Sequence, residues 1–139
     1  MLLMRAREAA MKHFRPHLGN HNVTEQQWRI LRVLAVQKSA DMFDLSERCS
    51  LQPSSLSRTI PLLVARGLVR RSSDPLDQRR VVVALSSQGR ALFQAMAAES
   101  AQIYARLEAD FGAERLAEVY RILDDLIADF ENAGEGADE

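Results

Sequence analysis

The sequence predicts a mainly α-helical fold that carries one small β-hairpin. In most of the 139-residue chain, apolar residues recur every three or four positions, which is the spacing of amphipathic helices. Between Leu68 and Leu85 this period is replaced by two short strand-like runs, 68–72 and 80–85, around a turn-rich segment. With 47% hydrophobic residues, the chain contains enough apolar material for one compact domain.

The first predicted helix spans residues 2–18, and Pro16 with Gly19 brings it to a close. His13, His17 and His21 follow one another at intervals of four, a spacing that invites a zinc-site interpretation. We expect no metal site here, because Pro16 and Gly19 interrupt the helical register and no carboxylate or cysteine stands beside the histidines in the sequence. Polar residues near a helix end are the simpler explanation.

The second predicted helix begins at Thr24 and runs to residue 35. Gln27 stands three positions after Thr24, in the spacing of a capping box. Trp28 starts the apolar stripe, so burial in the core is its expected role, although an indole can also line a pocket for an aromatic ligand. Arg29 and Arg32 flank it, where they could pair with a carboxylate or face water.

A helix-turn-helix is predicted next. Asp41 caps a short helix over 41–49, and a four-residue connection leads to a helix that starts at Pro53 and ends at Gly67. One side of this second helix is apolar and should face the core: Leu56, Ile60, Leu63 and Val64. Its other side carries groups able to contact base edges and phosphates: Ser54, Ser55, Ser57 and Arg58. With the hairpin attached, the motif is a winged helix-turn-helix.

Positive charge is concentrated in this region. Seven arginines and two acidic residues lie between Arg48 and Arg80, which gives a local charge of +5 in a chain whose net charge is −1. Such a basic patch is typical of a surface that binds nucleic acid. Within the hairpin, Arg70, Arg71 and Arg80 are expected to be positioning charges for DNA, or else part of a solvated face.

Two long amphipathic helices follow the hairpin. Ser86 caps the first, which runs to about Phe111, and Gly112 separates it from the second, at about 113–131. A winged DNA-binding core does not need them, so we expect their apolar stripes to bury against a second subunit. The predicted organisation is a single domain over 1–131, with a DNA-binding lobe at 24–89, dimerisation helices at 1–19 and 90–131, and a disordered acidic tail at 132–139.

The wing carries a recognisable pattern. Asp77-x-Arg79, followed by Leu85, Ser86 and Gly89, resembles the signature of the MarR-type winged helix-turn-helix regulators, and the resemblance covers essentially the whole chain. Pro61, inside the recognition helix, departs from the residues usual in that family and could change the angle of the helix. The resemblance implies a homodimer whose recognition helices enter adjacent major grooves of a pseudo-palindromic double-stranded operator. Arg79 would enter the minor groove, and Asp77 would hold Arg79 in place.

The first third of the chain is similar to a narrower group within that family. Residues 6–16 and 21–35 look like those of repressors that control operons for homoprotocatechuate and 4-hydroxyphenylacetate degradation. This resemblance implies a repressor of an aromatic-acid catabolic operon, released from its operator by a small aromatic carboxylate. The N-terminus has charges every few residues and no uninterrupted apolar run, so we expect neither a signal peptide nor a membrane span there and a cytoplasmic protein. The resemblance also points to five ligand-binding residues: Arg7, His13, Arg15, His21 and Trp28. A guanidinium would pair with the carboxylate, and the indole would stack on the ring.

Two alternatives stay open at this point. The single cysteine, Cys49, could make the protein a thiol-sensing repressor, although a small buried hydrophobic residue is the simpler role. The chain could also be a dimeric winged-helix module that acts through protein contacts. An enzyme is not expected, because the sequence holds no glycine-rich phosphate loop and no paired nucleophile and histidine, and we predict neither a cofactor nor a membrane partner.

Overall fold

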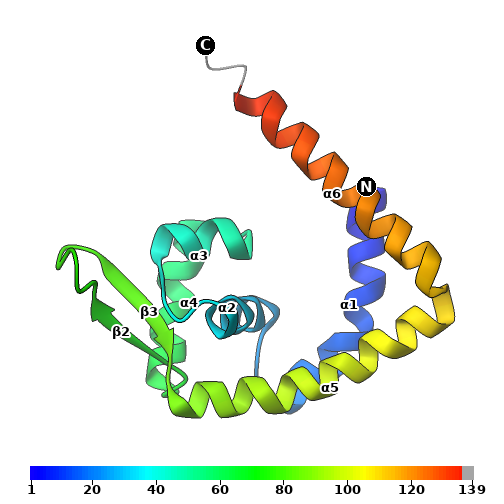
Figure 1. The fold of residues 1–139 in the computed structure, drawn as a ribbon. Helices are drawn as coiled ribbons and strands as arrows, with labels where there is room; N and C mark the ends of the chain where they lie inside the picture. Colours follow the sequence, from blue (N-terminus) through cyan, green and yellow to red (C-terminus); the bar gives the residue numbers. More distant parts are fainter. Residues whose placement is uncertain (136–139) are drawn as a thin grey trace. The chain divides into compact units, whose positions relative to one another are not determined.

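The computed structural model describes residues 1–135 and divides the chain into two compact units, Met1–Ser100 and Ala101–Glu139 (Figure 1). The first unit begins with two helices and a short strand, α1 (Leu2–Asn20), α2 (Glu25–Val36) and β1 (Ala40–Asp41). It continues through α3 (Met42–Cys49), α4 (Pro53–Ala65), β2 (Val69–Ser73) and β3 (Val81–Leu85). Helix α5 (Ser87–Phe111) starts in the first unit and ends in the second, which also contains α6 (Ala113–Glu135).

The prediction of a mainly α-helical winged helix-turn-helix fold is confirmed. Strand β1 was not predicted, and it completes a three-stranded antiparallel sheet in the order β1-β3-β2. Ala40 pairs with Val83, and Asp41 pairs with Val82. The predicted hairpin is present: each strand begins one residue later than expected, and Val69 pairs with Leu85.

The core lies between α2, α3, α4 and the sheet. Its fully buried large side chains come from all of these elements and from α5: Ile30, Leu31, Leu34, Leu45, Leu56, Ile60, Leu63, Val83 and Met96. The expectation that Val64 faces inward is wrong, because its side chain is 38% exposed while Thr59 is buried. Thr59 can be buried because its hydroxyl donates to the carbonyl of Ser55, one turn earlier in α4.

Three predicted helix ends are confirmed. The Thr24 hydroxyl accepts from the amide of Gln27, and the Gln27 side chain accepts from the amide of Thr24, which is a complete capping box. The Asp41 carboxylate accepts from the amide of Asp44 at the start of α3. After α4, Gly67 takes a left-handed φ of 69°, and the amide of Leu68 donates to the carbonyl of Leu63, as in a Schellman motif.

The two terminal helices are longer than predicted. Helix α1 continues through Pro16 and Gly19 to Asn20, because proline removes only one backbone hydrogen bond and the packing of Phe14, His17 and Leu18 holds the last turn. Helix α6 continues to Glu135, so residues 132–135 of the predicted acidic tail are helical. The rest of that tail, 136–139, lies outside the described residues.

The junction between the wing and α5 is built around a close backbone contact. The Ser86 hydroxyl donates to the carbonyl of Gly67 and accepts from the amide of Gly89, so it caps α5 as predicted. The amide of Ser86 donates to the carbonyl of Leu68 at 3.0 Å. A Cβ atom at position 89 would lie 1.9 Å from that same carbonyl oxygen, so only glycine fits there.

Among the described residues, no helix is long and apolar enough to cross a membrane.

Candidate nucleic-acid interface and ligand-binding residues

Helix α4 presents a polar face to solvent. Pro53 occupies its first turn, where a missing amide costs little, and Leu56, Ile60 and Leu63 hold the opposite face in the core. The predicted contact residues are exposed or, in the case of Ser55, half-buried: Ser54, Ser55, Ser57 and Arg58. The helix stays continuous through Pro61, which is itself exposed, so the predicted recognition helix keeps its length.

Apart from Arg48, the arginines of the basic region fall into two groups. Arg66 donates to the carbonyls of Asn22 and His21, which ties α4 to the loop after α1. Arg80 forms an ion pair with the largely buried carboxylate of Asp41, which ties the wing to the start of α3.

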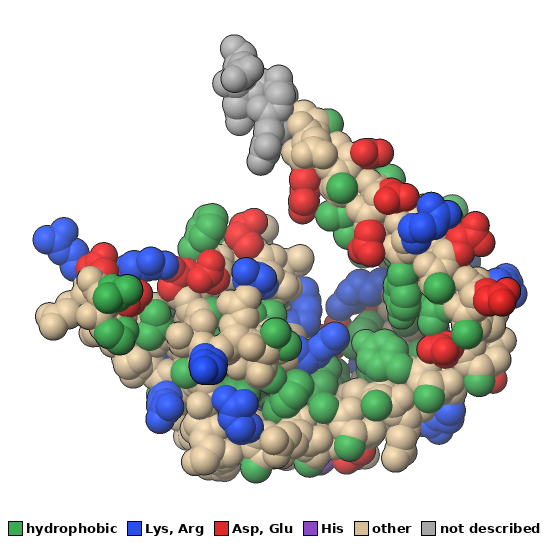
Figure 2. All heavy atoms as spheres, in the orientation of Figure 1, with side chains coloured by type: hydrophobic (Ala, Val, Ile, Leu, Met, Phe, Trp, Pro, Cys, Tyr) green, Lys and Arg blue, Asp and Glu red, His purple; other side chains and the backbone are tan. Residues whose placement is uncertain are grey.

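The other group faces solvent. Arg58, Arg70, Arg71 and Arg79 are exposed, and within residues 1–135 their side chains make no hydrogen bond or ion pair. Their guanidinium groups are therefore available to a partner. Figure 2 shows Lys and Arg side chains standing out from the tip of the β2–β3 hairpin, at the left of the view.

Carboxylates order the loop of the wing. Asp77 Oδ1 accepts from the amide of Arg79 at 3.0 Å, and Asp74 Oδ1 accepts from the amide of Leu76 at 2.8 Å. Such aspartate turns fix the backbone while the side chain of the following residue stays free. Asp77 thus contacts the backbone of Arg79 and not its guanidinium, which gives the predicted bracing role a specific form.

Two of the predicted ligand-binding arginines are engaged within the chain. Arg7 and Arg15 both donate to the Glu25 carboxylate, at 2.5 and 2.7 Å, and both also pair with Glu8. Burial raises the pKa of Glu25, but the hydrogen bonds from Arg15 and Arg7 outweigh it and leave that pKa below its ordinary value. A ligand carboxylate would have to compete with Glu8 and Glu25 for these guanidiniums.

The remaining predicted ligand residues do not gather around the arginines. Trp28 is buried and stacks on Phe93, with 5.4 Å between ring centroids, which fits the core role expected by default. His13 is exposed on α1. His21 donates to Glu99 at 3.0 Å. The structure therefore spreads the five predicted residues over four environments.

A carboxylate from a distant part of the sequence stands beside two of the histidines: Glu99 of α5 contacts both His17 and His21. The lack of a neighbouring carboxylate in the sequence therefore does not hold in the fold. Hydrogen bonds from His21 and His17 lower the pKa of Glu99 below its ordinary value. Because 78 residues separate His21 from Glu99, spacing along the chain gave no signal of this contact.

A second set of arginines surrounds a cleft of about 640 Å³ at the C-terminal half of α2 and the end of α3. Arg29 donates to the carbonyls of Cys49 and Ser50, so it caps α3, which is neither of the roles weighed for it. Its Nε atom is buried and has no partner among the described residues. The cleft is lined by Arg29, Arg32, Val33, Val36, Gln37, Arg48, Cys49 and Ser50.

Cys49 is buried at the end of α3. Burial raises the pKa of its thiol, although the nearby Arg29 opposes this. A raised pKa reduces the thiolate fraction, and the thiolate is the form that oxidants attack. The environment of Cys49 thus favours the packing role over the thiol switch.

The helix-turn-helix and its arginine-bearing wing define a winged helix-turn-helix protein of the DNA-binding class. A model of the MarR family matches residues 21–80. The chain is 39% identical to the homoprotocatechuate degradative operon repressor of Escherichia coli over 126 residues, which covers 91% of this chain and 85% of that protein. The chain therefore belongs to the MarR family, as the wing signature indicated.

Two solved structures are also similar over most of the chain. The transcriptional regulator PA4135 aligns with a TM-score of 0.86 at 38% identity and covers 90% of this chain and 92% of its own. NadR, solved in complex with 4-hydroxyphenylacetate, aligns with a TM-score of 0.79 at 36% identity and covers 89% of this chain and 88% of its own.

Proposed function

We propose that this protein is a homodimeric transcriptional repressor that binds a pseudo-palindromic operator and leaves it when a small aromatic carboxylate binds. The operon would be one for aromatic-acid degradation, as the name of the Escherichia coli relative suggests. This function is regulation and not catalysis, and action on operator DNA would place the protein in the cytoplasm.

The observation that carries the DNA-binding part is the set of unpaired guanidiniums beside a polar recognition helix. Arg58 on α4 and Arg79 in the wing are exposed and have no partner within residues 1–135. Arg70 and Arg71 lie on strand β2, which follows α4 and leads to the loop that carries Arg79. Arg58 would contact DNA from the helix in the major groove, and Arg79 from the wing in the minor groove.

The dimer is proposed from exposed apolar side chains on the terminal helices. The first four residues are between 60% and 94% exposed although all are large and hydrophobic: Met1, Leu2, Leu3 and Met4. Helix α6 exposes Tyr120, Ile122, Ile127 and Phe130 by half or more. Large exposed apolar surfaces of this kind are typical of protein interfaces. Two subunits would place the recognition helices about 34 Å apart, one turn of DNA.

For the effector, two locations are supported by different residues. The first is the α1–α2 contact, where Arg7 and Arg15 of the predicted set meet at Glu25; His13, His21 and Trp28 lie in other environments. The cleft beside α3 offers a second location, because Arg29, Arg32 and Arg48 bring three guanidiniums to one cavity. The structural relative solved with 4-hydroxyphenylacetate supports the class of ligand and does not choose between these locations.

Replacement of Arg79 tests the DNA-binding part. Arg79→Ala should weaken operator binding several-fold or more, because a minor-groove guanidinium is lost, while the dimer stays intact. The measurement is a mobility-shift titration at fixed salt with operator DNA recovered from the protein's own genome. Gln78→Ala is the matched control, since Gln78 is an exposed and uncharged neighbour in the same loop. Equal affinity of Arg79→Ala and wild type would remove Arg79 from the interface.

The salt dependence of binding separates a DNA regulator from a protein-interaction module. Phosphate contacts release counterions, so the affinity for DNA should fall steeply as salt rises. A weak affinity for random DNA that ignores salt would favour the protein-interaction module.

Calorimetry tests the effector. Dihydroxyphenylacetate and 4-hydroxyphenylacetate should each bind the protein and cause it to dissociate from the operator. Loss of heat in Arg15→Gln alone would locate the ligand at the α1–α2 end, and loss in Arg32→Gln alone would locate it in the cleft. No heat and no release of DNA with either compound would reject this ligand class.

A further inference from the structure

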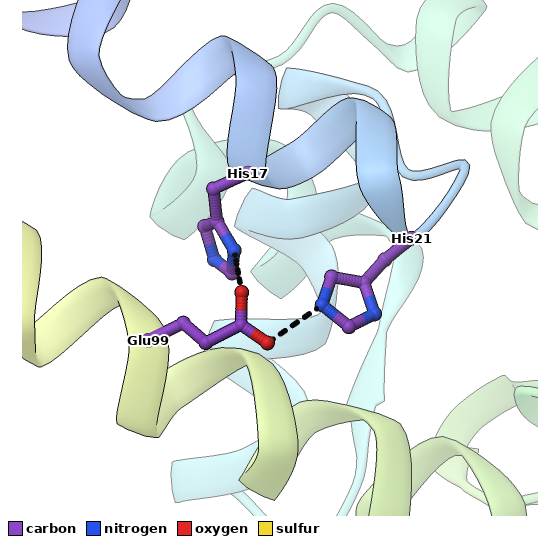
Figure 3. A group of neighbouring side chains, drawn as sticks. All are labelled: His17, His21 and Glu99. Atoms are coloured by element: carbon purple, nitrogen blue, oxygen red, sulfur yellow. Dashed lines mark hydrogen bonds and ion pairs between the residues drawn. The ribbon is translucent and has the colours of Figure 1, made fainter.

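The end of α1 and the middle of α5 bring two histidines and one glutamate together (Figure 3). His17 Nδ1 lies 2.8 Å from Glu99 Oε2, and His21 Nε2 lies 3.0 Å from Glu99 Oε1. The three candidate ligand atoms all lie within 4.8 Å of one another. All three residues belong to the unit Met1–Ser100.

We propose that His17, His21 and Glu99 form a binding site for a divalent transition metal of the zinc class. This inference goes beyond the proposed repressor function and does not depend on it. Imidazole nitrogens and a carboxylate are ligands that zinc accepts, and two histidines with one glutamate are a known ligand set for zinc that keeps an open position.

The distances suit a metal of this size. Zinc bonds of about 2.0–2.1 Å in tetrahedral geometry place neighbouring ligand atoms about 3.3 Å apart. The two nitrogen–oxygen distances, 2.8 and 3.0 Å, differ from that value by half an ångström or less, on the order of a side-chain adjustment. The three candidate ligand atoms all lie within 4.8 Å of one another, so the side chains would have to shift relative to one another to reach the tetrahedral spacing.

Ser100 supports the change of protonation that metal binding needs. A carboxylate oxygen only accepts, so His17 Nδ1 donates to Glu99, and the Ser100 hydroxyl lies 3.0 Å from His17 Nε2, where it can accept or donate. With a metal on Nδ1, that nitrogen would give up its proton, Nε2 would carry the proton of the neutral ring, and the Ser100 hydroxyl would accept from it. A hydroxyl can take either role, so His17 keeps a satisfied partner in both states although its side chain is only 6% exposed.

The site is fixed on one side and open on the other. The His17 ring packs edge-on against Trp28, with 6.4 Å between the ring centroids. The His21 ring packs edge-on against His17, with 5.5 Å between the ring centroids. The side chain of Glu99 is 48% exposed, so water can reach the carboxylate and supply a fourth ligand. Bound metal would join the end of α1 to α5, next to the wall formed by Trp28 and Phe93.

The test is a titration of the chelator-treated full chain with Zn²⁺, followed by calorimetry, and with Co²⁺, followed by its visible absorption. Wild type should bind one Zn²⁺ per chain, melt at a higher temperature with zinc than without, and give the intense Co²⁺ bands of a four-coordinate site. Glu99→Gln and His21→Gln should each weaken zinc binding by about a hundredfold or more. Ser100→Ala should weaken it by about ten- to a hundredfold, as expected for a residue that orients a ligand.

Glu47→Gln is the matched control, because Glu47 is an exposed glutamate of α3 in the same unit and lies outside the cluster. It should bind zinc as wild type does. The proposal is overturned if wild type does not bind Zn²⁺, if Glu99→Gln and His21→Gln bind it as wild type does, or if Glu47→Gln weakens binding as much as they do. Because DNA is absent from these titrations, their failure would leave the repressor function untouched.

Discussion

Replacing Gly89 by alanine should separate the wing from α5. The added Cβ would lie 1.9 Å from the carbonyl oxygen of Leu68 and 2.8 Å from its carbonyl carbon. Both atoms belong to the backbone, so no side-chain rotation relieves the clash. The start of α5 would have to move away from Leu68, and the hydrogen bonds that Ser86 makes to Gly67 and Leu68 would stretch with it.

The expected cost follows from two losses. Forcing an extra carbon into a packed contact typically costs 1–3 kcal/mol, so about 2 kcal/mol is a reasonable value here. Loss of the Ser86 cap adds about 1 kcal/mol. Gly89→Ala should therefore lower the free energy of unfolding by about 3 kcal/mol, which is a large fraction of the stability of a domain this size.

Gly19→Ala provides the control for this experiment. Gly19 is also helical, but nothing lies within 4 Å of the position that its Cβ would take. The same chemical change should be neutral there or stabilise α1 by up to about 1 kcal/mol. Urea unfolding at a fixed protein concentration measures both variants. If the free energy of unfolding of Gly89→Ala lies within about 0.5 kcal/mol of the wild-type value, the backbone at this junction can move to accept a Cβ atom, and the predicted cost of the close contact is refuted.

Three further predictions concern the interface, acid stability and the cysteine. Arg58→Ala should lower sequence preference as well as affinity, and equal losses on operator and random DNA would show a phosphate contact instead. Because hydrogen bonds from Arg15 and Arg7 hold the pKa of Glu25 below its unfolded value, its contribution is present above the unfolded pKa and disappears as pH falls through the folded one. Glu25→Gln should thus destabilise the protein at pH 7, by about 1 kcal/mol or less, and little at pH 3; an equal loss at both pH values would contradict the linkage. Peroxide should leave DNA binding intact, and inhibition seen in wild type but absent from Cys49→Ser would restore the thiol switch.

Local sequence signals predicted the helix-turn-helix and its caps well. Thr24, Asp41 and Gly67 act within a few residues of their own positions, so the side chain and backbone geometry that they require can be inferred from the sequence alone. The same holds for Pro53 at the start of α4. The C-terminal end of α1 was harder to predict, because Pro16 weakens a helix locally, whereas the burial of Phe14 and Leu18 in the folded protein keeps this segment helical.

Features that depend on distant segments could not be predicted from spacing. Strand β1 is two residues long and exists only because β3 lies beside it. Glu99 contacts His17 and His21 but lies 82 and 78 residues after them in the sequence, so the sequence showed no carboxylate near the histidines. Arg80 looked like a DNA contact by its charge, and only the fold shows that Asp41 pairs with it.

The wing and the recognition helix are joined through backbone contacts that leave little room for independent movement. The Ser86 hydroxyl binds Gly67 at the end of α4, and the amide of Ser86 binds Leu68 at the start of the wing. The pair of Arg80 and Asp41 fixes the other side of the hairpin to α3. A ligand that releases such a lobe from DNA would meet strong resistance if it bent the wing away from α4. We therefore expect an effector to act by changing the separation of the two lobes in the proposed dimer, with the contacts within each lobe unchanged.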